Sequence, residues 1–422
     1  MTLIKQNIPL KVATVFSGIG AFEQALLQTG IDHEIVFACD NGERELKFSY
    51  STLCDICANF SSKQKIEFVT TLIETNKIDK TKVPVDYLYN KIFTNPSKKS
   101  SGLQLTYECI QLLTTKLSPS EREKYVEYLY SLTNKENSVK ASYMANYNLN
   151  PNDWHEDIRF LQGKEYQGKV DIIMGGSPCQ SFSTYGKKRG LEDTRGTLFY
   201  DYARLIQEVK PKIFIYENVK GLLCHDKGRT WEIMKEVWES LDYNISFQVL
   251  NAQHYNLPQM RKRLFVVGVS KKLKTKKFIF PEKRPLIMKS TDLLEKEVPN
   301  KYYLPEKGFK WTTDVSRNKN KSRINRDIIG CQTAVQQFNW SGDFRLEPAQ
   351  SIHRKDPKIY IGKKDGQDMV VRKLMPIECL RLMGFKNFKI VVDDNTMYRQ
   401  SGNSVAVPVL KAILDEIQKQ IL

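Results

Sequence analysis

The sequence has few cysteines and histidines and no long uninterrupted apolar run. Eight cysteines and five histidines among 422 residues are too few for a disulfide framework. The one close pair, Cys54-x-x-Cys57, has no second pair nearby, so we expect no metal site. The chain shows no run of about 18 apolar residues that would span a membrane and no signal-peptide core at its amino terminus. These absences exclude secreted miniproteins, membrane proteins and fibres, and we expect a cytoplasmic protein with reduced thiols.

Acidic residues are scarce relative to basic ones. The formal net charge is +17, which favours a polyanionic partner. The excess is concentrated, because 23 lysines and arginines accompany only 12 acids between Lys271 and Val371. A lysine-rich surface without a ligand is the alternative. Because concentration favours nucleic acid, we expect neutralised lysines in 271–371 to flatten the salt dependence of binding.

Short apolar runs that alternate with helical patterns indicate an α/β sheet. Strands are expected over 11–16, 34–39, 170–174, 212–216, 245–250 and 264–269. Helical spacing is found over 21–27, 198–209, 230–241 and 405–421. This alternation predicts a doubly wound sheet with crossover helices.

Two segments interrupt the alternation. Residues 43–150 have little strand character and predict amphipathic helices over 63–76 and 118–132, so we interpret them as a helical insertion. Residues 271–371 mix short strands, turns and basic residues and predict a second, smaller domain. The main domain would then comprise 1–270 and the returning segment 372–422. The insertion could be inert, bind a protein partner or contact nucleic acid, and its nearly balanced charge favours the first two.

A glycine-containing loop follows the first expected strand. Phe16-Ser17-Gly18-Ile19-Gly20 opens a helix, and its glycines let the backbone approach a cofactor closely. Asp40 lies 22 residues after Gly18, a position that suits binding of a ribose diol. The full G-x-G-x-x-G fingerprint is missing, which favours a cofactor without a pyrophosphate, such as S-adenosylmethionine. A strand-turn-helix without a ligand is the alternative.

Reactive side chains also lie next to the ends of three later expected strands. Cys179 comes after the strand over 170–174, where a rigid Gly- and Pro-containing turn can present a thiolate, and a buried structural thiol is the alternative. Glu217 ends the next strand, where desolvation raises the pKa of a carboxyl and suits it to proton donation. Arg261 and Arg263 run into the strand over 264–269, and there they need acidic or carbonyl partners.

In this order the motifs resemble those of the cytosine-5 DNA methyltransferases of bacterial restriction–modification systems. The matching segments are Phe16–Gly20, Asp40, Asp157-Ile158, Pro178-Cys179-Gln180, Glu217-Asn218-Val219, Gln259-x-Arg261-x-Arg263, Arg372–Phe385 and Gly402-Asn403-Ser404-Val405. They lie in 1–42, 150–270 and 372–422, a little over half of the chain. The resemblance implies an S-adenosylmethionine-dependent methyltransferase (Rossmann-like) domain, with 271–371 as a mixed target-recognition domain.

The resemblance also implies roles for single residues. Cys179 would add to C6 of a flipped-out cytosine, Glu217 would engage N3 and the exocyclic amine, and Arg263 would hold the O2 side with support from Arg261. The implied cofactor pocket consists of Phe16, Gly18, Ile19, Gly20, Asp40, Asp157, Ile158, Gly176, Pro178, Leu198, Asn403 and Ser404. The implied DNA contacts are Gln180, Ser183, Lys187, Lys188, Arg189, Arg195, Gln336 and Gln337.

The implied product is 5-methylcytosine in a short sequence of double-stranded DNA, which would protect host DNA from a cognate restriction endonuclease acting on the same site. We expect a monomer. A tRNA cytosine-5 methyltransferase and an inactive DNA-binding paralogue are the alternatives, but the Cys-Phe-Thr tripeptide of the tRNA branch is absent and Cys179 and Glu217 are present. Two departures are Asn41, where many relatives carry an aromatic residue, and Tyr185 in the loop after Cys179.

Overall fold

The computed structural model describes residues 9–46, 61–75, 84–94, 117–131, 133, 135–178, 194–314, 322–335, 340–351 and 359–422. The chain divides into two compact units, one of residues 1–40, 138–154 and 163–422 and the other of residues 41–137 and 155–162. Each unit is described by itself. Across the described ranges, no helix combines the length and the apolar character that a membrane crossing requires.

A seven-stranded sheet forms the centre of the first unit. Its strands, in the order β3-β2-β1-β4-β5-β7-β6, are β3 (Trp154–His155), β2 (His33–Cys39), β1 (Leu10–Val15), β4 (Ile172–Gly175), β5 (Ile213–Val219), β7 (Lys262–Ser270) and β6 (Tyr243–Asn251). Strands β2, β1, β4 and β5 pair in parallel. All six expected strands are present, so the predicted α/β fold is confirmed.

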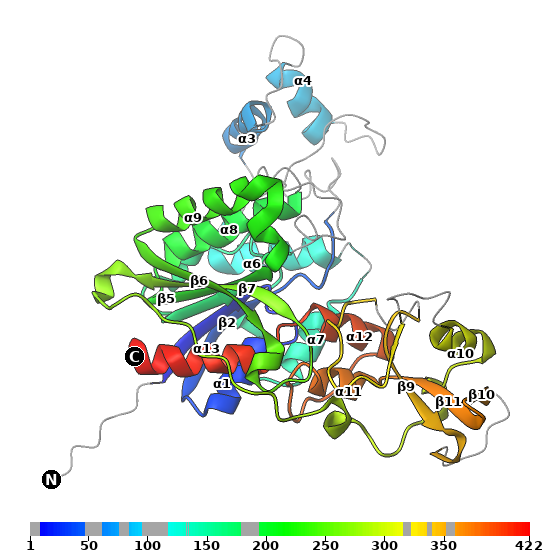
Figure 1. The fold of residues 1–422 in the computed structure, drawn as a ribbon. Coiled ribbons are helices and arrows are strands. Elements are labelled where there is room, and N and C mark those ends of the chain that lie inside the picture. Colours follow the sequence, from blue (N-terminus) through cyan, green and yellow to red (C-terminus); the bar gives the residue numbers. More distant parts are fainter. Residues whose placement is uncertain are drawn as a thin grey trace. The chain divides into compact units, whose positions relative to one another are not determined.

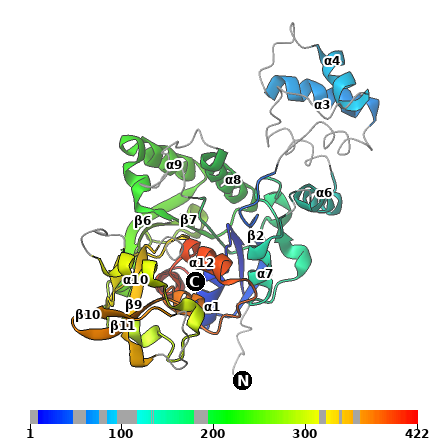
Figure 2. The same ribbon diagram turned by 90° about the vertical axis from the view of Figure 1, so that its right-hand side faces the viewer.

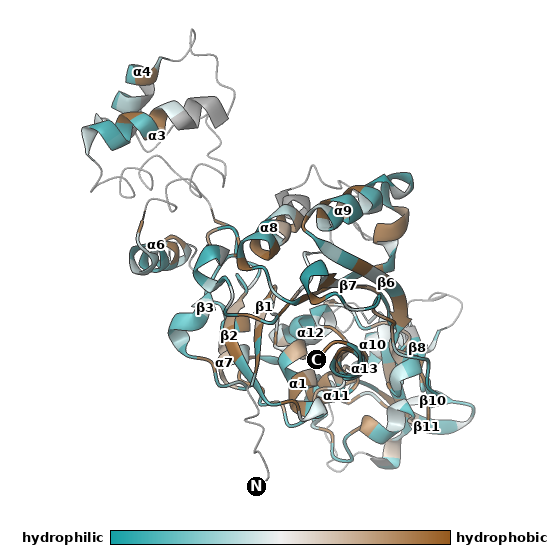
Figure 3. Ribbon diagram, turned by 90° about the vertical axis from the view of Figure 1, so that its left-hand side faces the viewer, coloured by the Kyte–Doolittle hydropathy of each residue, from teal (hydrophilic) through white to brown (hydrophobic). Residues whose placement is uncertain are grey.

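Helices cover both faces of this sheet (Figure 1). On one face lie α1 (Ala21–Thr29) and α13 (Val407–Gln420), whose apolar residues share a core with β1, β4, β5 and β7. On the other lie α8 (Thr194–Val209) and α9 (Arg229–Ser240), where Phe199 and Trp238 pack edge to face at 5.2 Å between ring centroids. Figure 3 shows hydrophobic residues concentrated in the strands and hydrophilic ones on the outer side of α9.

Strand β7 is antiparallel to both β5 and β6. The physical reason is the short link between β6 and β7, since a parallel crossover needs a dozen or more residues and usually a helix. As a result, β7 starts at Lys262 beside the carboxyl end of β5 and finishes at Ser270 beside the amino end of β5, where the Ser270 N–H donates to the Lys212 carbonyl at 2.9 Å.

Residues 278–288, which we name the strap, run from the edge of the sheet where β7 ends to the edge where β6 ends. Phe278 and Phe280 are buried in the core beside α13. The Phe278 carbonyl accepts a hydrogen bond from Ser246 Oγ at 2.8 Å, and the Ile287 N–H donates to Asn256 Oδ1 at 3.1 Å. The strap therefore packs on the main sheet, although the sequence predicted that the small domain begins at 271.

A second sheet has four strands in the order β10-β11-β9-β8. They are β8 (Ser322–Ile324), β9 (Gly342–Pro348), β10 (Gly362–Lys364) and β11 (Gln367–Lys373). Asp365 and Gly366, both with positive φ, form the two-residue turn between β10 and β11, as Asp-Gly sequences favour. Figures 1 and 2 show this sheet beside α10 (Glu306–Thr313), whose Phe309 packs on Phe344 and Val371.

Two further helices follow the small sheet and return the chain to the main one. They are α11 (Pro376–Arg381) and α12 (Asp394–Asn403). Arg372, only 1% exposed, anchors this return, because its guanidinium bonds the Glu378 carboxylate at 2.9 Å and the Glu347 carboxylate at 2.8 Å.

The second unit is helical in its described residues, as the sequence predicted for the insertion. It contains α3 (Ser62–Thr75), α4 (Val85–Tyr89), the π-helical turn Asn90–Thr94 and α6 (Pro119–Ser131). The insertion was expected to extend to 150, but α7 (Ser138–Met144) belongs to the first unit. The cause is an apolar cluster in which Tyr143, Tyr147 and Trp154 pack on Ala38 of β2.

Candidate active site

The carboxyl ends of three neighbouring strands form one edge of the main sheet. Val15 of β1 pairs with Gly175 of β4, and Gly175 pairs with Tyr216 of β5. The residues that follow, Phe16, Gly176 and Glu217, therefore stand in a row at that edge. Open α/β sheets bind ligands at this edge, so three of the sequence-predicted segments are brought together.

The loop after β1 has an unusual backbone. Phe16, Gly18 and Gly20 all have positive φ, at 53°, 53° and 78°. A positive φ is strained for phenylalanine and costs glycine little. The Gly18 N–H donates to Asp40 Oδ2 at 2.9 Å, which joins the loop to the end of β2. Strain that the surroundings hold in place is typical of ligand-binding loops.

A buried polar network supports this loop from α7 and from the residues that follow it. The Tyr147 hydroxyl donates to the Gly20 carbonyl at 2.7 Å, and its ring occupies the space that a Cβ on Gly20 would need. Glu23, 1% exposed, accepts hydrogen bonds from Tyr143 Oη at 2.6 Å and Thr14 Oγ1 at 2.7 Å. Burial raises the pKa of Glu23, and these hydrogen bonds lower it in part. Sequence reasoning missed these partners, because nothing in the local pattern pairs residues 120 positions apart.

The same loop leaves room for a small molecule. A Cβ built on Gly18 would meet no atom of the described residues within 4 Å, so among those residues the backbone there faces open space. The Asp40 carboxylate stands beside that space through its bond to Gly18. An open glycine backbone with one adjacent carboxylate is an arrangement that can bind the ribose of a nucleoside.

The loop after β4 contacts Glu217 closely. A Cβ on Gly176 would come within 2.5 Å of the Glu217 carbonyl and 3.3 Å of its Oε2, so only glycine allows this approach. Ser177 Oγ and Tyr216 Oη lie 2.6 Å apart. The Asn218 side-chain amide donates to Tyr216 Oη at 2.9 Å and to the Ser177 carbonyl at 3.3 Å. Asn218 thus fastens the segment that leads to Cys179. The sequence placed Asn218 in the Glu217-Asn218-Val219 motif but predicted no role for it.

Glu217 and Arg263 form an ion pair at the end of β5. Arg263 Nε lies 3.2 Å from Glu217 Oε1, and the two side chains are 18% and 15% exposed. Burial raises the pKa of Glu217 above its ordinary value of 4.5, while Arg263 and Arg261 lower it in part. A carboxyl with a raised pKa keeps its proton to higher pH and can donate it.

Arg261 has a different environment. It is 3% exposed, and its guanidinium donates to the carbonyls of Gln332, Gly402 and Ser404 at 2.8, 3.2 and 2.5 Å. Arg261 therefore has the expected carbonyl partners, whereas Arg263 has the expected acid and also donates to the Lys262 carbonyl. Arg261 ties the segment after α12 to the strand that carries Arg263.

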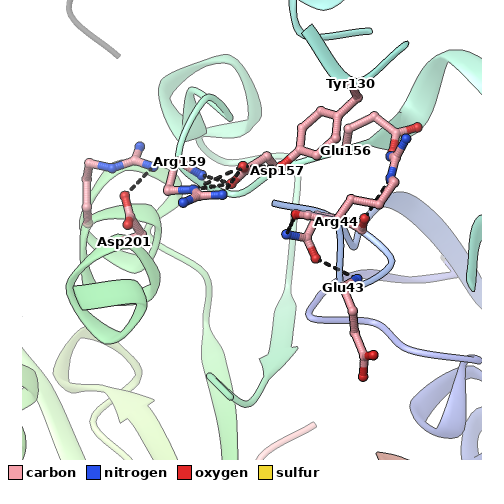
Figure 4. A network of polar contacts seen from close by, with 9 residues as sticks. Glu43, Arg44, Tyr130, Glu156, Asp157, Arg159 and Asp201 are labelled. Carbon is pink, nitrogen blue, oxygen red and sulfur yellow. Dashed lines mark hydrogen bonds and ion pairs between the residues drawn. The ribbon is translucent and has the colours of Figure 1, made fainter. Parts of the chain in front are cut away.

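Asp157 and Ile158, expected at the cofactor, lie in the second unit. Figure 4 shows Asp157 between Tyr130 and Arg159. Its Oδ2 accepts from Tyr130 Oη at 2.5 Å, and its Oδ1 accepts from Arg159 Nε at 2.9 Å. Arg44 pairs with Glu156 beside them. The Asp157 carboxylate is therefore engaged on both oxygens within its own unit.

The remaining expected site residues divide into described and undescribed ones. Pro178 and Leu198 are half-buried, Ile19 and Ser404 are buried, and Asn403 is exposed. Outside the described residues lie Cys179, Gln180, Ser183, Lys187, Lys188, Arg189, Gln336 and Gln337, as does the side chain of Arg195.

Comparison with known proteins gives the family. Residues 120–419 match the family of C-5 cytosine-specific DNA methylases. The chain is 37% identical over 283 residues to the type II methyltransferase M.SsoII of Shigella sonnei, which covers 66% of this chain and 71% of that protein. It is 36% identical over 294 residues to the type II methyltransferase M.HpaII of Haemophilus parainfluenzae, covering 67% and 81%.

A solved structure shares the fold. The Dnmt2 methyltransferase of S. pombe superposes with a TM-score of 0.55 at 16% identity, covering 97% of this chain and 99% of that one. The chain belongs to the C-5 cytosine-specific DNA methylase family. It is a DNA (cytosine-5-)-methyltransferase of the type II class that its relatives represent, which confirms the activity expected from the motifs.

Proposed function

We propose that the chain takes a methyl group from S-adenosylmethionine and transfers it to C5 of a cytosine flipped out of a short, specific sequence of double-stranded DNA. The observation that carries this proposal is the Glu217–Arg263 pair beside Gly176, at the edge where the open Gly18 loop also lies. A carboxyl that can donate a proton and an open glycine loop beside a carboxylate thus lie at one sheet edge, and cytosine methylation needs both a proton donor and a bound cofactor. The modified site would be protected from a cognate restriction endonuclease.

Cys179 supplies the nucleophile in this proposal. Cytosine C5 is a poor nucleophile until a thiolate adds across C6, after which the ring resembles an enamine. Glu217 holds the proton that N3 receives as the thiolate adds, and Arg263 holds the O2 side of the ring. When the C5 proton is lost, Cys179 leaves C6 and the product is released. The target atom is inaccessible inside a duplex, so the base must be flipped.

Phe16, Gly18, Ile19, Gly20 and Asp40 would hold S-adenosylmethionine, with Asp40 on the ribose hydroxyls. Bound there, the cofactor supplies an electrophilic methyl group. The complete proposed pocket also contains Gly176, Pro178, Leu198, Asn403 and Ser404.

The Asp40→Ala variant is expected to bind S-adenosylmethionine about 30-fold more weakly, because a charged acceptor for the ribose diol is worth about 2 kcal/mol. Isothermal titration calorimetry without DNA measures this loss independently of catalysis. The matched control is Asp32→Ala, since Asp32 is exposed beside the opposite end of β2. Equal affinity in the two variants would place the ribose elsewhere.

We propose that DNA is bound by the loop after Cys179 and by the part of 271–371 that follows its first lysines. Gln180, Ser183, Lys187, Lys188, Arg189 and Arg195 lie in the loop, and Gln336 and Gln337 would fill space at the flipped base. The structure divides the basic segment. Lys271 follows β7 at the edge of the sheet where β5 begins, and the candidate active site lies at the opposite edge. The chain therefore starts away from that site when it enters the next exposed lysines, which are Lys272, Lys274, Lys276 and Lys277.

Replacing those four lysines with alanine is expected to change the slope of log Kd against log salt by less than about one, although four phosphate contacts would contribute about 3.6. Replacing Arg317, Lys319 and Lys321 between α10 and β8 is the matched contrast and should flatten the slope by about two or more. Filter binding across a salt series measures both. A slope that falls only with the first set would move the DNA to the amino edge.

The proposed function is tested by methyl transfer to unmethylated plasmid. Purified protein, S-adenosylmethionine and plasmid are incubated, and 5-methylcytosine is mapped by bisulfite sequencing. Conversion-resistant cytosines in one recurring short context support the proposal and reveal the recognition sequence. If DNA stays unmethylated and tRNA becomes methylated, the assigned fold would stand but the substrate would be tRNA. We further propose a cytoplasmic monomer, with sedimentation at micromolar concentration as the check on its oligomeric state.

A further inference from the structure

A segment of the small domain runs along the residues that precede β7. The Ile329 N–H donates to the Pro258 carbonyl and the Met260 N–H donates to the Ile329 carbonyl, both at 2.9 Å. The Gln332 N–H donates to Gln259 Oε1 at 3.1 Å. Residues 329–332 therefore form a short ladder with 258–261, immediately before Arg263.

Cys331 is the member of this segment that contacts both arginines. Its Sγ accepts from Arg261 Nη1 at 3.4 Å and from Arg263 Nη2 at 3.7 Å. Arg263 presents Nε to Glu217 at 3.2 Å and Nη1 to the Lys262 carbonyl at 3.0 Å. Cys331 Sγ thus contacts the Arg263 guanidinium at Nη2, whereas Glu217 contacts it at Nε.

We propose that Cys331 is a positioning residue for methyl transfer, which holds the Arg263 guanidinium against Glu217 from the small domain. The inference rests on the proposed roles of Glu217 and Arg263. Arginine loses much side-chain entropy when it is fixed, and a planar guanidinium bonded on several edges keeps one orientation. Through Cys331, the domain proposed to read the DNA sequence touches the pair proposed to act on the base.

The electrostatics agree with this geometry. Burial by itself raises the pKa of the Cys331 thiol, but Arg261 and Arg263 outweigh it, so the pKa lies below its ordinary value of 9.0. The two guanidinium groups that lower this pKa are the same groups that Cys331 Sγ contacts. The groups that act on Glu217 are Arg263 and Arg261, and Cys331 lies against both.

The first test measures the contact without any methylation. Iodoacetamide alkylation across a pH series, followed at single cysteines by peptide mass spectrometry, gives the thiol pKa of Cys331, and the exposed Cys224 serves as internal control for the reagent. Arg263→Ala should shift the alkylation profile of Cys331 to higher pH and leave that of Cys224 unchanged, because Arg263 lowers the pKa of Cys331. Identical profiles for Cys331 in both proteins would overturn the contact even if the proposed function fails.

The second test compares Cys331→Ala, Cys331→Ser and Cys224→Ala on an unmethylated oligonucleotide duplex that carries the mapped recognition site. Loss of the acceptor should lower kcat about fivefold, the equivalent of about 1 kcal/mol, with KM for DNA changed less than twofold. Serine keeps an acceptor and should recover most of the rate, and Cys224→Ala should match the unchanged protein.

The pH profile separates positioning from a merely structural loss. When Arg263 is released, the pKa of Glu217 rises further, so the falling limb of kcat/KM should move to higher pH in Cys331→Ala and return in Cys331→Ser. A lower rate with an unmoved limb, or equal loss in alanine and serine variants with unchanged melting temperatures, would overturn the proposal.

Discussion

The Cys179→Ala variant is expected to lose all measurable methyl transfer, a fall of about four orders of magnitude or more, because removal of a covalent nucleophile leaves only binding and positioning. The bond from sulfur to C6 is what makes C5 reactive, and alanine offers no group that can replace it. Bisulfite sequencing of plasmid incubated with the variant measures the loss.

DNA binding provides the necessary control for this result. The Kd of Cys179→Ala for a duplex carrying the mapped site should stay within about threefold of the unchanged protein, since phosphate contacts dominate affinity. Full activity in the variant would refute the assigned nucleophile. Loss of both binding and activity would show that the loop after β4 had been disturbed instead.

Glu217→Gln is expected to lower kcat by about 10²–10⁴-fold, the range that general acid catalysis contributes. Glutamine preserves the shape that packs on Gly176 but has no acidic proton to give to N3. Burial raises the pKa of Glu217 above 4.5 and the two arginines only partly oppose it. The protonated donor is therefore present below that raised pKa and is lost as pH rises through it.

A series of kcat/KM measurements from pH 5 to 9 checks the sign. The unchanged protein should show a falling limb at high pH, and Glu217→Gln should lack that limb. Glu232→Gln is a matched control, since Glu232 lies in the first turn of α9 and is exposed. A falling limb that persists in Glu217→Gln would assign the proton to another group.

The sequence predicted those features that depend on the local pattern of residues, namely the strands and the position of Glu217. Apolar runs of strand length became β1, β2 and β4–β7, and Glu217 lies at a strand end because its own neighbours Ile213–Tyr216 are apolar. The pKa shift of Glu217 was also predictable, since any carboxyl at the end of a buried strand is desolvated.

The contacts that hold the site were not predictable, because they join residues far apart in the chain. Tyr147 supports Gly20 across 127 positions, and Cys331 meets Arg263 across 68. No periodicity encodes such pairs. The net charge of 271–371 also could not locate the DNA-binding surface. A count of basic residues does not show that Lys272–Lys277 begin at the edge of the sheet opposite Arg261.

The strap sets where a foreign specificity module could be joined. Because Phe278 and Phe280 belong to the main core, a chimaera cut at 271 would exchange two side chains of the recipient's own interior along with the small sheet. A junction after Lys289 leaves that interior intact, and Arg372 with its two carboxylates marks the matching exit. The segment that can be exchanged without altering the main core is thus shorter than the basic segment 271–371, because Phe278, Phe280 and Arg372 are buried.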